Sequence, residues 1–220
     1  MIAKQLISED IFPLSLSNTA NEALSRMIEY KVSHFPVVEN GKFIGVISEQ
    51  NIYNHTNLDE ELREELIYFE NYFVSEQQYI FDILKLTEGN KLSLVPVVDG
   101  KGLYIGCISI GNILSFFAKS MSVNSPGGVI VLEVSSNDYS LTEIANIVES
   151  NDAKVLSTYV VSETNSTKLD VIIKVSKLDL GSLLQTFERY GYKINASYGE
   201  EFDYDNIKDN YDSLINYLNV

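Results

Sequence analysis

Two stretches of the chain repeat one pattern, and this pattern decides the fold. They read SHFPVVENGKFIGVIS at residues 33–48 and SLVPVVDGKGLYIGCIS at residues 93–109. Pro36 matches Pro96, and Gly45 matches Gly106. The second copy carries one extra residue in its turn. Because self-similarity at a fixed period marks a repeated structural unit, we expect two copies of one fold in tandem.

Each copy of the pattern predicts a β-hairpin. The proline forces the residue before it into an extended conformation, and the two valines that follow favour a strand. Asn40-Gly41 and Asp99-Gly100 tolerate positive φ, so the chain is expected to fold back at these positions. The return strands are continuously apolar, which is typical of strands covered on both faces.

A helix is expected before each hairpin and another after it. Asn18-Thr19 is a suitable N-terminal cap for the first helix. Apolar residues at helical spacing form one stripe in each copy, namely Ala20, Ala23, Leu24, Met27 and Ile28 in the first, and Ile80, Ile83 and Leu84 in the second. The predicted unit is therefore strand, helix, strand, strand, helix, about sixty residues long and present twice.

This unit resembles the CBS domain, and two in tandem resemble the pair called a Bateman module. The resemblance places the first domain at residues 1–60 and the second at residues 61–122. Members of this family are regulatory proteins that hold adenine nucleotides in clefts between the two repeats. The resemblance therefore implies a non-enzymatic sensor, with AMP, ADP, ATP or S-adenosylmethionine as candidate regulatory ligands.

The family pattern also implies which residues would line the clefts. A Ser or Thr ends the return strand, and an Asp three residues later bonds the ribose hydroxyls. The matching positions are Ser48 with Asn51 and Ser109 with Asn112. The segments expected at the adenine are Phe12, Pro13, His34, Phe35 and Pro36 in one cleft, and Phe73, Val74, Leu94, Val95 and Pro96 in the other.

The sequence departs from the family at the ribose position, where both aspartates are asparagines. An amide offers one neutral oxygen, so the loss of a charge-assisted bond costs about 1 kcal/mol or more of affinity. Basic residues for a phosphate are also scarce, since only His34 and Lys4 are near. Two interpretations stay open. Either each cleft binds an adenosine-type ligand of low charge, or Asn51 and Asn112 are only helix N-caps.

Residues 127–198 predict a second fold. Strands and amphipathic helices follow in the order βαββαβ, the ferredoxin-like arrangement, so the chain as a whole belongs to the α+β class. The segment resembles an ACT domain, and the domain order is similar to that of the AcuB family of acetoin-utilisation proteins. Dimerisation is the conservative expectation for this domain, with amino-acid binding an open alternative. Residues 199–220 predict an acidic tail and a C-terminal helix.

Charge and composition exclude several functions. With 16 basic and 31 acidic residues the net charge is −15, which disfavours nucleic acid and anionic membranes as partners. One cysteine and two histidines give no zinc spacing, and no phosphate-binding loop is present. Cys107 is expected to be a buried structural thiol. We expect no catalytic residue, no metal site and a cytoplasmic location. The acidic run at 59–65 is expected to be a solvated helix face.

Two functional hypotheses follow. The first is a regulatory homodimer whose CBS pair senses an adenosine-containing ligand and modulates a protein partner. The second is a dimeric scaffold or interaction protein with vestigial ligand clefts.

Overall fold

The computed structural model describes residues 1–54, 57–68, 72–162 and 166–199. The chain divides between Phe116 and Phe117 into two compact units. The acidic tail and helix predicted for 199–220 lie outside the described residues beyond Gly199.

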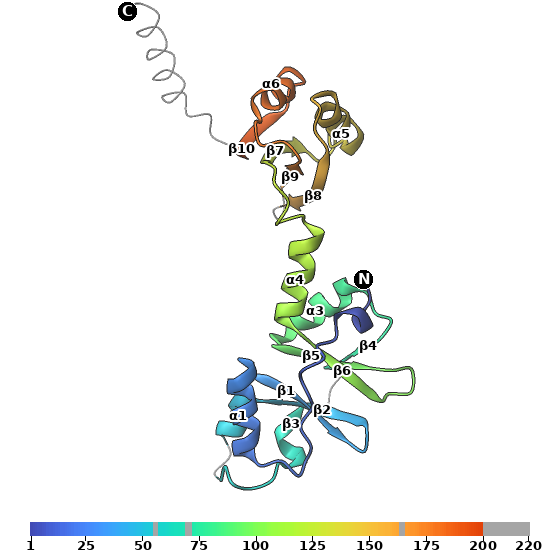
Figure 1. Ribbon diagram of the computed structural model, residues 1–220, viewed down its shortest axis with the longest axis vertical. Helices are drawn as coiled ribbons and strands as arrows, with labels where there is room; N and C mark the ends of the chain where they lie inside the picture. The colour runs from blue at the N-terminus through green and yellow to red at the C-terminus, as the bar shows by residue number, and fades with distance from the viewer. Residues whose placement is uncertain (55–56, 69–71, 163–165, 200–220) are drawn as a thin grey trace, which may run out of the picture. The chain divides into compact units, whose positions relative to one another are not determined.

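Both predicted hairpins are present in the first unit (Figure 1). Their strands are β1 (His34–Glu39) with β2 (Lys42–Ser48), and β5 (Leu94–Val98) with β6 (Tyr104–Ser109). Phe35 pairs with Ile47 in the first hairpin, and Val95 pairs with Ile108 in the second. The matched apolar pattern of the two sequence copies therefore gives two hairpins of the same register.

The two turns differ in their chemistry. In the first, Asn40 and Gly41 take φ values of 50° and 79°, as the sequence predicts. In the second, positive φ falls at Gly102 and not at Gly100, so the prediction for Gly100 is wrong. The extra residue moves the bend, because the Asp99 carboxylate accepts the backbone N–H groups of Lys101 and Leu103 and so shapes the loop.

The helices also repeat. The helices before the hairpins are α1 (Ala20–Tyr30) and α3 (Ile80–Asn90), and those after them are α2 (Glu49–Tyr53) and α4 (Ile110–Ser120). Thr19 caps α1 in a capping box with Glu22. Both α1 and α3 end at a left-handed lysine, Lys31 and Lys91, with φ of 54° and 52°. The helices before the two hairpins therefore start and stop at matching residues, whereas α4 is longer than α2.

The segment that leads into each repeat lies on the other repeat. β3 (Ile67–Tyr68) continues the 3-10 helix η2 (Glu64–Leu66) and pairs antiparallel with β2. In the mirror position, the segment after η1 (Ala3–Leu6) bridges to β6, where the Ser8 N–H donates to the Cys107 carbonyl at 2.8 Å. Each hairpin is thus extended by the neighbouring repeat, with the strand β3 on the first hairpin and the single bridge at Ser8 on the second.

The acidic run at 59–65 belongs to this exchanged segment. It is not the helix that the sequence predicts, because Leu62 is buried and its N–H donates to the Asn18 carbonyl at 2.8 Å. An extended chain makes this contact with the start of α1, while its carboxylates stay exposed.

Short parallel strands complete the two sheets. β4 (Val74–Ser75) runs parallel to β5, and Leu14 makes the matching bridge to Val37. The core of the first unit includes Phe35 and Ile47 of one hairpin and Leu94 and Cys107 of the other, so both repeats share one interior. Burial raises the pKa of the Cys107 thiol to about 11, which confirms an inert buried thiol.

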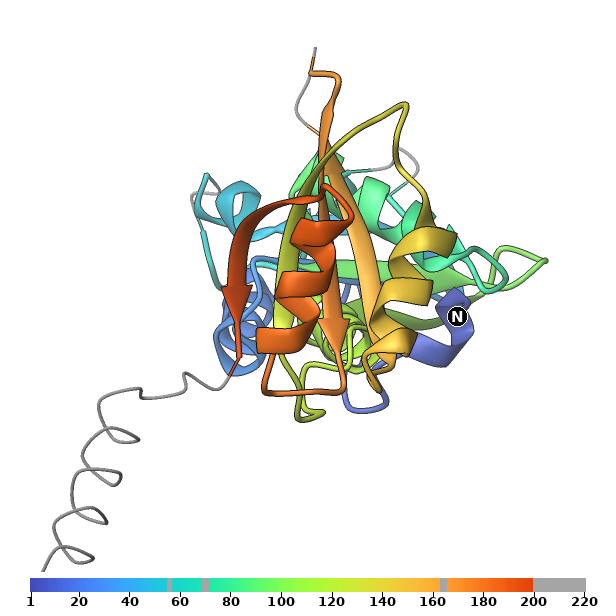
Figure 2. The same cartoon turned by 90° about the horizontal axis from the view of Figure 1, so that it is seen from above.

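The second unit has the predicted ferredoxin-like topology. Its strands are β7 (Val129–Ser135), β8 (Val155–Ser162), β9 (Lys168–Val175) and β10 (Lys193–Tyr198), and its helices are α5 (Leu141–Ser150) and α6 (Gly181–Arg189). The antiparallel sheet has the order β10-β7-β9-β8. Figure 2 shows α5 and α6 side by side across one face of this sheet. Their buried side chains form a separate core around Phe187.

The close approach of the exchanged segment generates a test. Gly106 has φ of 146°, and a Cβ there would collide with the Ile7 side chain. Gly106→Ala should therefore lower the free energy of unfolding by about 2 kcal/mol, measured by urea titration with circular dichroism. Gly100→Ala is the matched control, since no atom lies within 4 Å of its added Cβ. Equal stability of the two variants would contradict the packing of Ile7 on Gly106.

Candidate functional site

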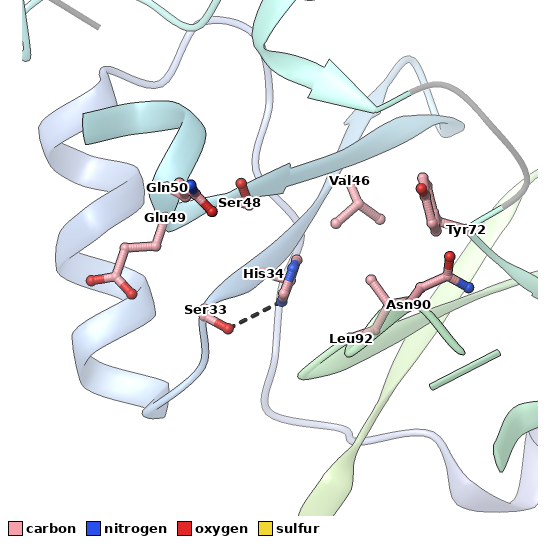
Figure 3. A pocket seen from close by; sticks show the side chains of 9 residues that line it. All are labelled: Ser33, His34, Val46, Ser48, Glu49, Gln50, Tyr72, Asn90 and Leu92. Atoms are coloured by element: carbon pink, nitrogen blue, oxygen red, sulfur yellow. Dashed lines mark hydrogen bonds between the residues drawn. The ribbon is translucent and has the colours of Figure 1, made fainter. Parts of the chain in front are cut away.

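A hollow of about 340 Å³ lies between the two repeats (Figure 3). We call it the Ser48 cleft. Its lining residues from the first repeat are Ser33, His34, Val46, Ser48, Glu49 and Gln50, and those from the second are Tyr72, Asn90 and Leu92. The strand ends of β1 and β2 and the start of α2 form one wall, and the end of α3 forms the other. A molecule in this cleft would contact both repeats at once.

Ser48 is held in place by the helix that follows it. It ends β2, caps α2, and accepts the Asn51 N–H at 3.1 Å. Ser109 plays the same part before α4, where its Oγ accepts the Asn112 N–H at 3.1 Å. The serines are therefore the caps, and the hypothesis that the asparagines are N-caps is wrong. An N-cap precedes the helix, whereas Asn51 is its third residue.

The asparagine side chains bind the exchanged segments. Asn51 Nδ2 donates to the Leu66 carbonyl at 3.1 Å, and Asn112 Nδ2 donates to the Leu6 carbonyl at 2.9 Å. These two contacts match across the repeat. A carboxylate in either place would have no proton to donate. The amides are thus structural clips between the repeats, and their departure from the family aspartate has a physical reason.

The predicted site residues other than the asparagines and Ser109 lie in four environments. His34 and Ser48 line the cleft. Five residues are buried in the hairpin strands, namely Phe35, Pro36, Leu94, Val95 and Pro96. Phe12 and Pro13 turn their carbonyls to the Arg26 guanidinium, and the Phe12 side chain is 67 % exposed. The structure therefore does not bring Phe12 and Pro13 to the Ser48 cleft.

Phe73 and Val74 line a neighbouring hollow of about 370 Å³. We call it the α3 gap, because Gln78, Asp82, Lys85, Leu86 and Asn90 on and before α3 form its other wall. Asn90 lines both hollows, so the α3 gap and the Ser48 cleft adjoin at this side chain.

Seven of the nine lining residues were absent from the predicted site, namely Ser33, Val46, Glu49, Gln50, Tyr72, Asn90 and Leu92. Tyr72, Asn90 and Leu92 come from the second repeat, whereas the prediction assigned this cleft only to first-repeat segments. A usable signal was the repeat itself. Tyr72 stands at the position that Phe12 holds in the first copy, and exchange of the leading segments carries it to the opposite cleft.

His34 is held neutral in the cleft wall. The Ser93 N–H points at His34 Nδ1 at 3.4 Å, so Nδ1 accepts and the ring proton lies on Nε2. Burial lowers the pKa of His34 from its ordinary value of 6.5. Lys4, the other predicted phosphate contact, is paired with Glu76 at 2.9 Å. Neither residue supplies a free positive charge.

Two further findings on the described residues concern metal ions and membranes. They bring together no group of three or more His, Cys, Asp or Glu side chains suited to a metal ion. Within the same part of the chain, no helix has the length and apolar character needed to cross a bilayer.

The clips predict a change of stability. Asn112→Asp removes the donated proton and sets a carboxylate against the Leu6 carbonyl, so the free energy of unfolding should fall by about 2 kcal/mol. Thermal unfolding at pH 7 measures the change. Asn124→Asp, in an exposed turn, makes the same chemical change and should stay within about 0.5 kcal/mol of the parent protein. A stable Asn112→Asp variant would show that the clip is dispensable.

His34 predicts a dependence of stability on pH. Its pKa in the folded protein lies below that of the unfolded chain, so unfolding takes up a proton between the two values. The free energy of unfolding should therefore fall as the pH drops from about 7.5 to 5.5. His34→Gln removes this contribution and should flatten the curve in that window. If parent and variant have the same slope there, His34 is not buried as described.

Comparison with known proteins gives one family match in each repeat. A family model of the CBS domain matches residues 3–56 and 66–119. An uncharacterized protein of Methanocaldococcus jannaschii is 26 % identical over 117 residues, which are 53 % of this chain and 39 % of that protein. Two further curated relatives are likewise matched over only 22 % and 23 % of their lengths.

Solved structures show the same fold. A CBS domain pair/ACT domain protein from Thermotoga maritima has a TM-score of 0.50 at 24 % identity, covering 55 % of this chain and 99 % of that one. An acetoin utilization protein (AcuB) from Vibrio cholerae has a TM-score of 0.49 at 18 % identity, covering 56 % and 95 %. Other matching CBS structures were determined with AMP, with ATP, or with 5′-methylthioadenosine and S-adenosylmethionine.

The matched hairpins, the matched helix caps and the family model agree on one identification. The first half of this chain is a tandem pair of CBS domains, and the chain belongs to the CBS-domain proteins.

Proposed function

We propose that this chain is a non-enzymatic regulatory protein whose Ser48 cleft binds an adenosine-type ligand of low charge. The observation that carries the proposal is the origin of the cleft walls. Ser48 comes from the first repeat and Asn90 from the second, and both line one hollow of about 340 Å³. This volume is within the range of small-molecule sites.

The composition of the cleft supports a ligand that is apolar on one side and polar on the other. Val46 and Leu92 offer apolar surface for a flat ring, while Ser48 and Gln50 offer hydroxyl and amide groups for sugar hydroxyls. A few polar groups of this kind fix the orientation of a ligand in a site. A nucleoside has this division between base and ribose.

Charge selects among adenosine compounds. Glu49 is the one charged side chain in the described lining of the cleft at neutral pH, since His34 is neutral there. A triphosphate brought beside Glu49 is repelled, and the net charge of −15 adds to this repulsion. Adenosine, 5′-methylthioadenosine or S-adenosylmethionine therefore fits the cleft better than ADP or ATP. AMP, with one phosphate, is intermediate.

A ligand held by both repeats would act as a cross-link. Binding would favour the arrangement of the CBS pair in which the two walls are correctly spaced, and this is the form of coupling that regulates a partner. The proposal includes a homodimer in the cytoplasm that modulates a protein partner in this way.

The second candidate is a dimeric scaffold without a ligand. The asparagine clips favour the scaffold, because the Asn51 amide donates to the Leu66 carbonyl and not to a ribose. In this interpretation the cleft is a by-product of the seam between the repeats.

Calorimetry with the full chain separates the two candidates. Adenosine, S-adenosylmethionine, AMP and ATP are titrated to millimolar concentration. We expect adenosine to bind at least tenfold more tightly than ATP, which corresponds to about 1.4 kcal/mol. Absence of heat with every ligand, for a protein that is folded by circular dichroism, would reject the sensor and leave the scaffold.

A charge reversal tests the assignment to the Ser48 cleft. Glu49→Lys should raise the affinity for AMP about tenfold and leave adenosine within a factor of about three, because only the phosphate meets the new charge. Glu188→Lys, an exposed residue of α6, changes the net charge equally and serves as the control. If both variants bind AMP alike, the ligand does not lie beside Glu49.

A further inference from the structure

Because the CBS domain occurs twice, residues of the Ser48 cleft can be compared with the residues at the equivalent positions of the other repeat. α1 and α3 are both 11 residues long, and each ends at a left-handed lysine. The last helical residues, Tyr30 and Asn90, therefore hold equivalent positions. Leu14 and Val74 are equivalent in the same way, because they make parallel bridges to the matched residues Val37 and Val97.

The two equivalent positions carry different side chains with different contacts. Asn90 lines both the Ser48 cleft and the α3 gap, and its amide donates to the Leu86 carbonyl of its own helix at 3.0 Å. Tyr30 instead reaches out of its helix. Its hydroxyl donates to the Asp10 carbonyl at 2.8 Å, and its ring lies 6.0 Å from that of Phe35.

A second side chain of α1 also bonds to a backbone carbonyl of the segment that precedes the helix. Arg26 donates to the Pro13 carbonyl at 3.0 Å, and its counterpart on α3 is Leu86, which has no donor to offer. Arg26 and Tyr30 thus tie α1 to the segment 10–13. On the other repeat, the space between α3 and the equivalent residues Phe73 and Val74 is the α3 gap of about 370 Å³.

We propose that the two clefts of this CBS pair are not equivalent. The Ser48 cleft, extended past Asn90 into the α3 gap, is the one adenosine site of the CBS pair, and Tyr30 with Arg26 closes its counterpart beside Ser109. Tyr30 is therefore a specificity-determining residue that sets the number of adenosine ligands at one per CBS pair. This inference rests on the proposed function for the identity of the ligand, but not for the closure itself.

The chemistry of the pair supports closure by Tyr30. The ring is far larger than an amide side chain, and its hydroxyl has a carbonyl partner, so the residue is satisfied where it lies. Its ring also packs against the shared core around Phe35. Opening this cleft would break the bond to Asp10 and expose aromatic surface, whereas a ligand entering the Ser48 cleft has no such contact to displace at Asn90 beyond its own helix.

The repeat allows a reciprocal exchange of the two residues. Equilibrium dialysis with radiolabelled adenosine counts the sites in the full chain. The parent protein should bind one adenosine, Tyr30→Asn two, and Asn90→Tyr should bind at least tenfold more weakly than the parent. Tyr30→Phe keeps the ring and loses only the hydroxyl, so it should still bind one. Two adenosines on the parent, or undiminished binding to Asn90→Tyr, would overturn the proposal.

A second readout needs no ligand. Hydrogen exchange followed by mass spectrometry should show faster exchange at residues 8–14 in Tyr30→Asn, with residues 72–76 unchanged. If the parent binds no adenosine but exchange changes in this way, the proposed function fails and the closure stands. If exchange at 8–14 is unaltered, Tyr30 does not hold this segment and the closure is wrong.

Discussion

The first unit depends on an exchange of leading segments, fixed at two points by asparagine amides. Asn51 holds the Leu66 carbonyl and Asn112 holds the Leu6 carbonyl. Without this exchange, β2 and β6 would each present an open edge, which proteins normally cover. The exchange therefore makes one domain of two repeats, and it explains why Phe35 and Cys107 share a core although they belong to different copies.

The same exchange places the cleft. Because the leading segment of the second repeat crosses to the first, Tyr72 reaches the wall formed by Val46 and Ser48. A cleft built in this way lies on the seam, and any molecule in it contacts both repeats. In the proposed function, sensitivity to a ligand follows from this topology, and the side chains of the cleft set which ligand is preferred. The side chains then decide what enters, and here Glu49 and the neutral His34 decide against polyanions.

The sequence predicts well what local chemistry determines. Pro36 and Pro96 each stand third in a strand and Thr19 caps a helix, all through contacts within a few residues, so the hairpins and helices could be found from spacing. The ferredoxin-like order of the second unit was visible for the same reason. The errors share a different cause. Positive φ lies at Gly102 rather than Gly100 because Asp99 organises the loop. The acidic run forms no long helix because Leu62 is buried against the start of α1, and only its end enters the 3-10 helix η2.

The candidate site was predicted only in part, because its walls bring together residues that lie far apart in the sequence. His34 and Ser48 carry a family pattern and were found, whereas Asn90 and Tyr72 have meaning only once the segments are exchanged. The family pattern also pointed to Asn51 as a ligand contact, although its amide donates to a backbone carbonyl of the other repeat. A motif identifies a position in the fold, but the atoms around it decide the role.

The two copies agree at residues that hold the exchanged segments and differ at residues that would contact a ligand. Positions that hold the exchange are matched, as Ser48 with Ser109 and Asn51 with Asn112 show. Other positions that face a cleft are unmatched, as Tyr30 with Asn90 shows. Residues of the first kind act on the shared core, where a change in one copy destabilises both. Residues of the second kind make their hydrogen bonds within their own repeat, Tyr30 with Asp10 and Asn90 with Leu86, so each copy can change alone. A tandem repeat can therefore keep one frame while its two clefts acquire different uses.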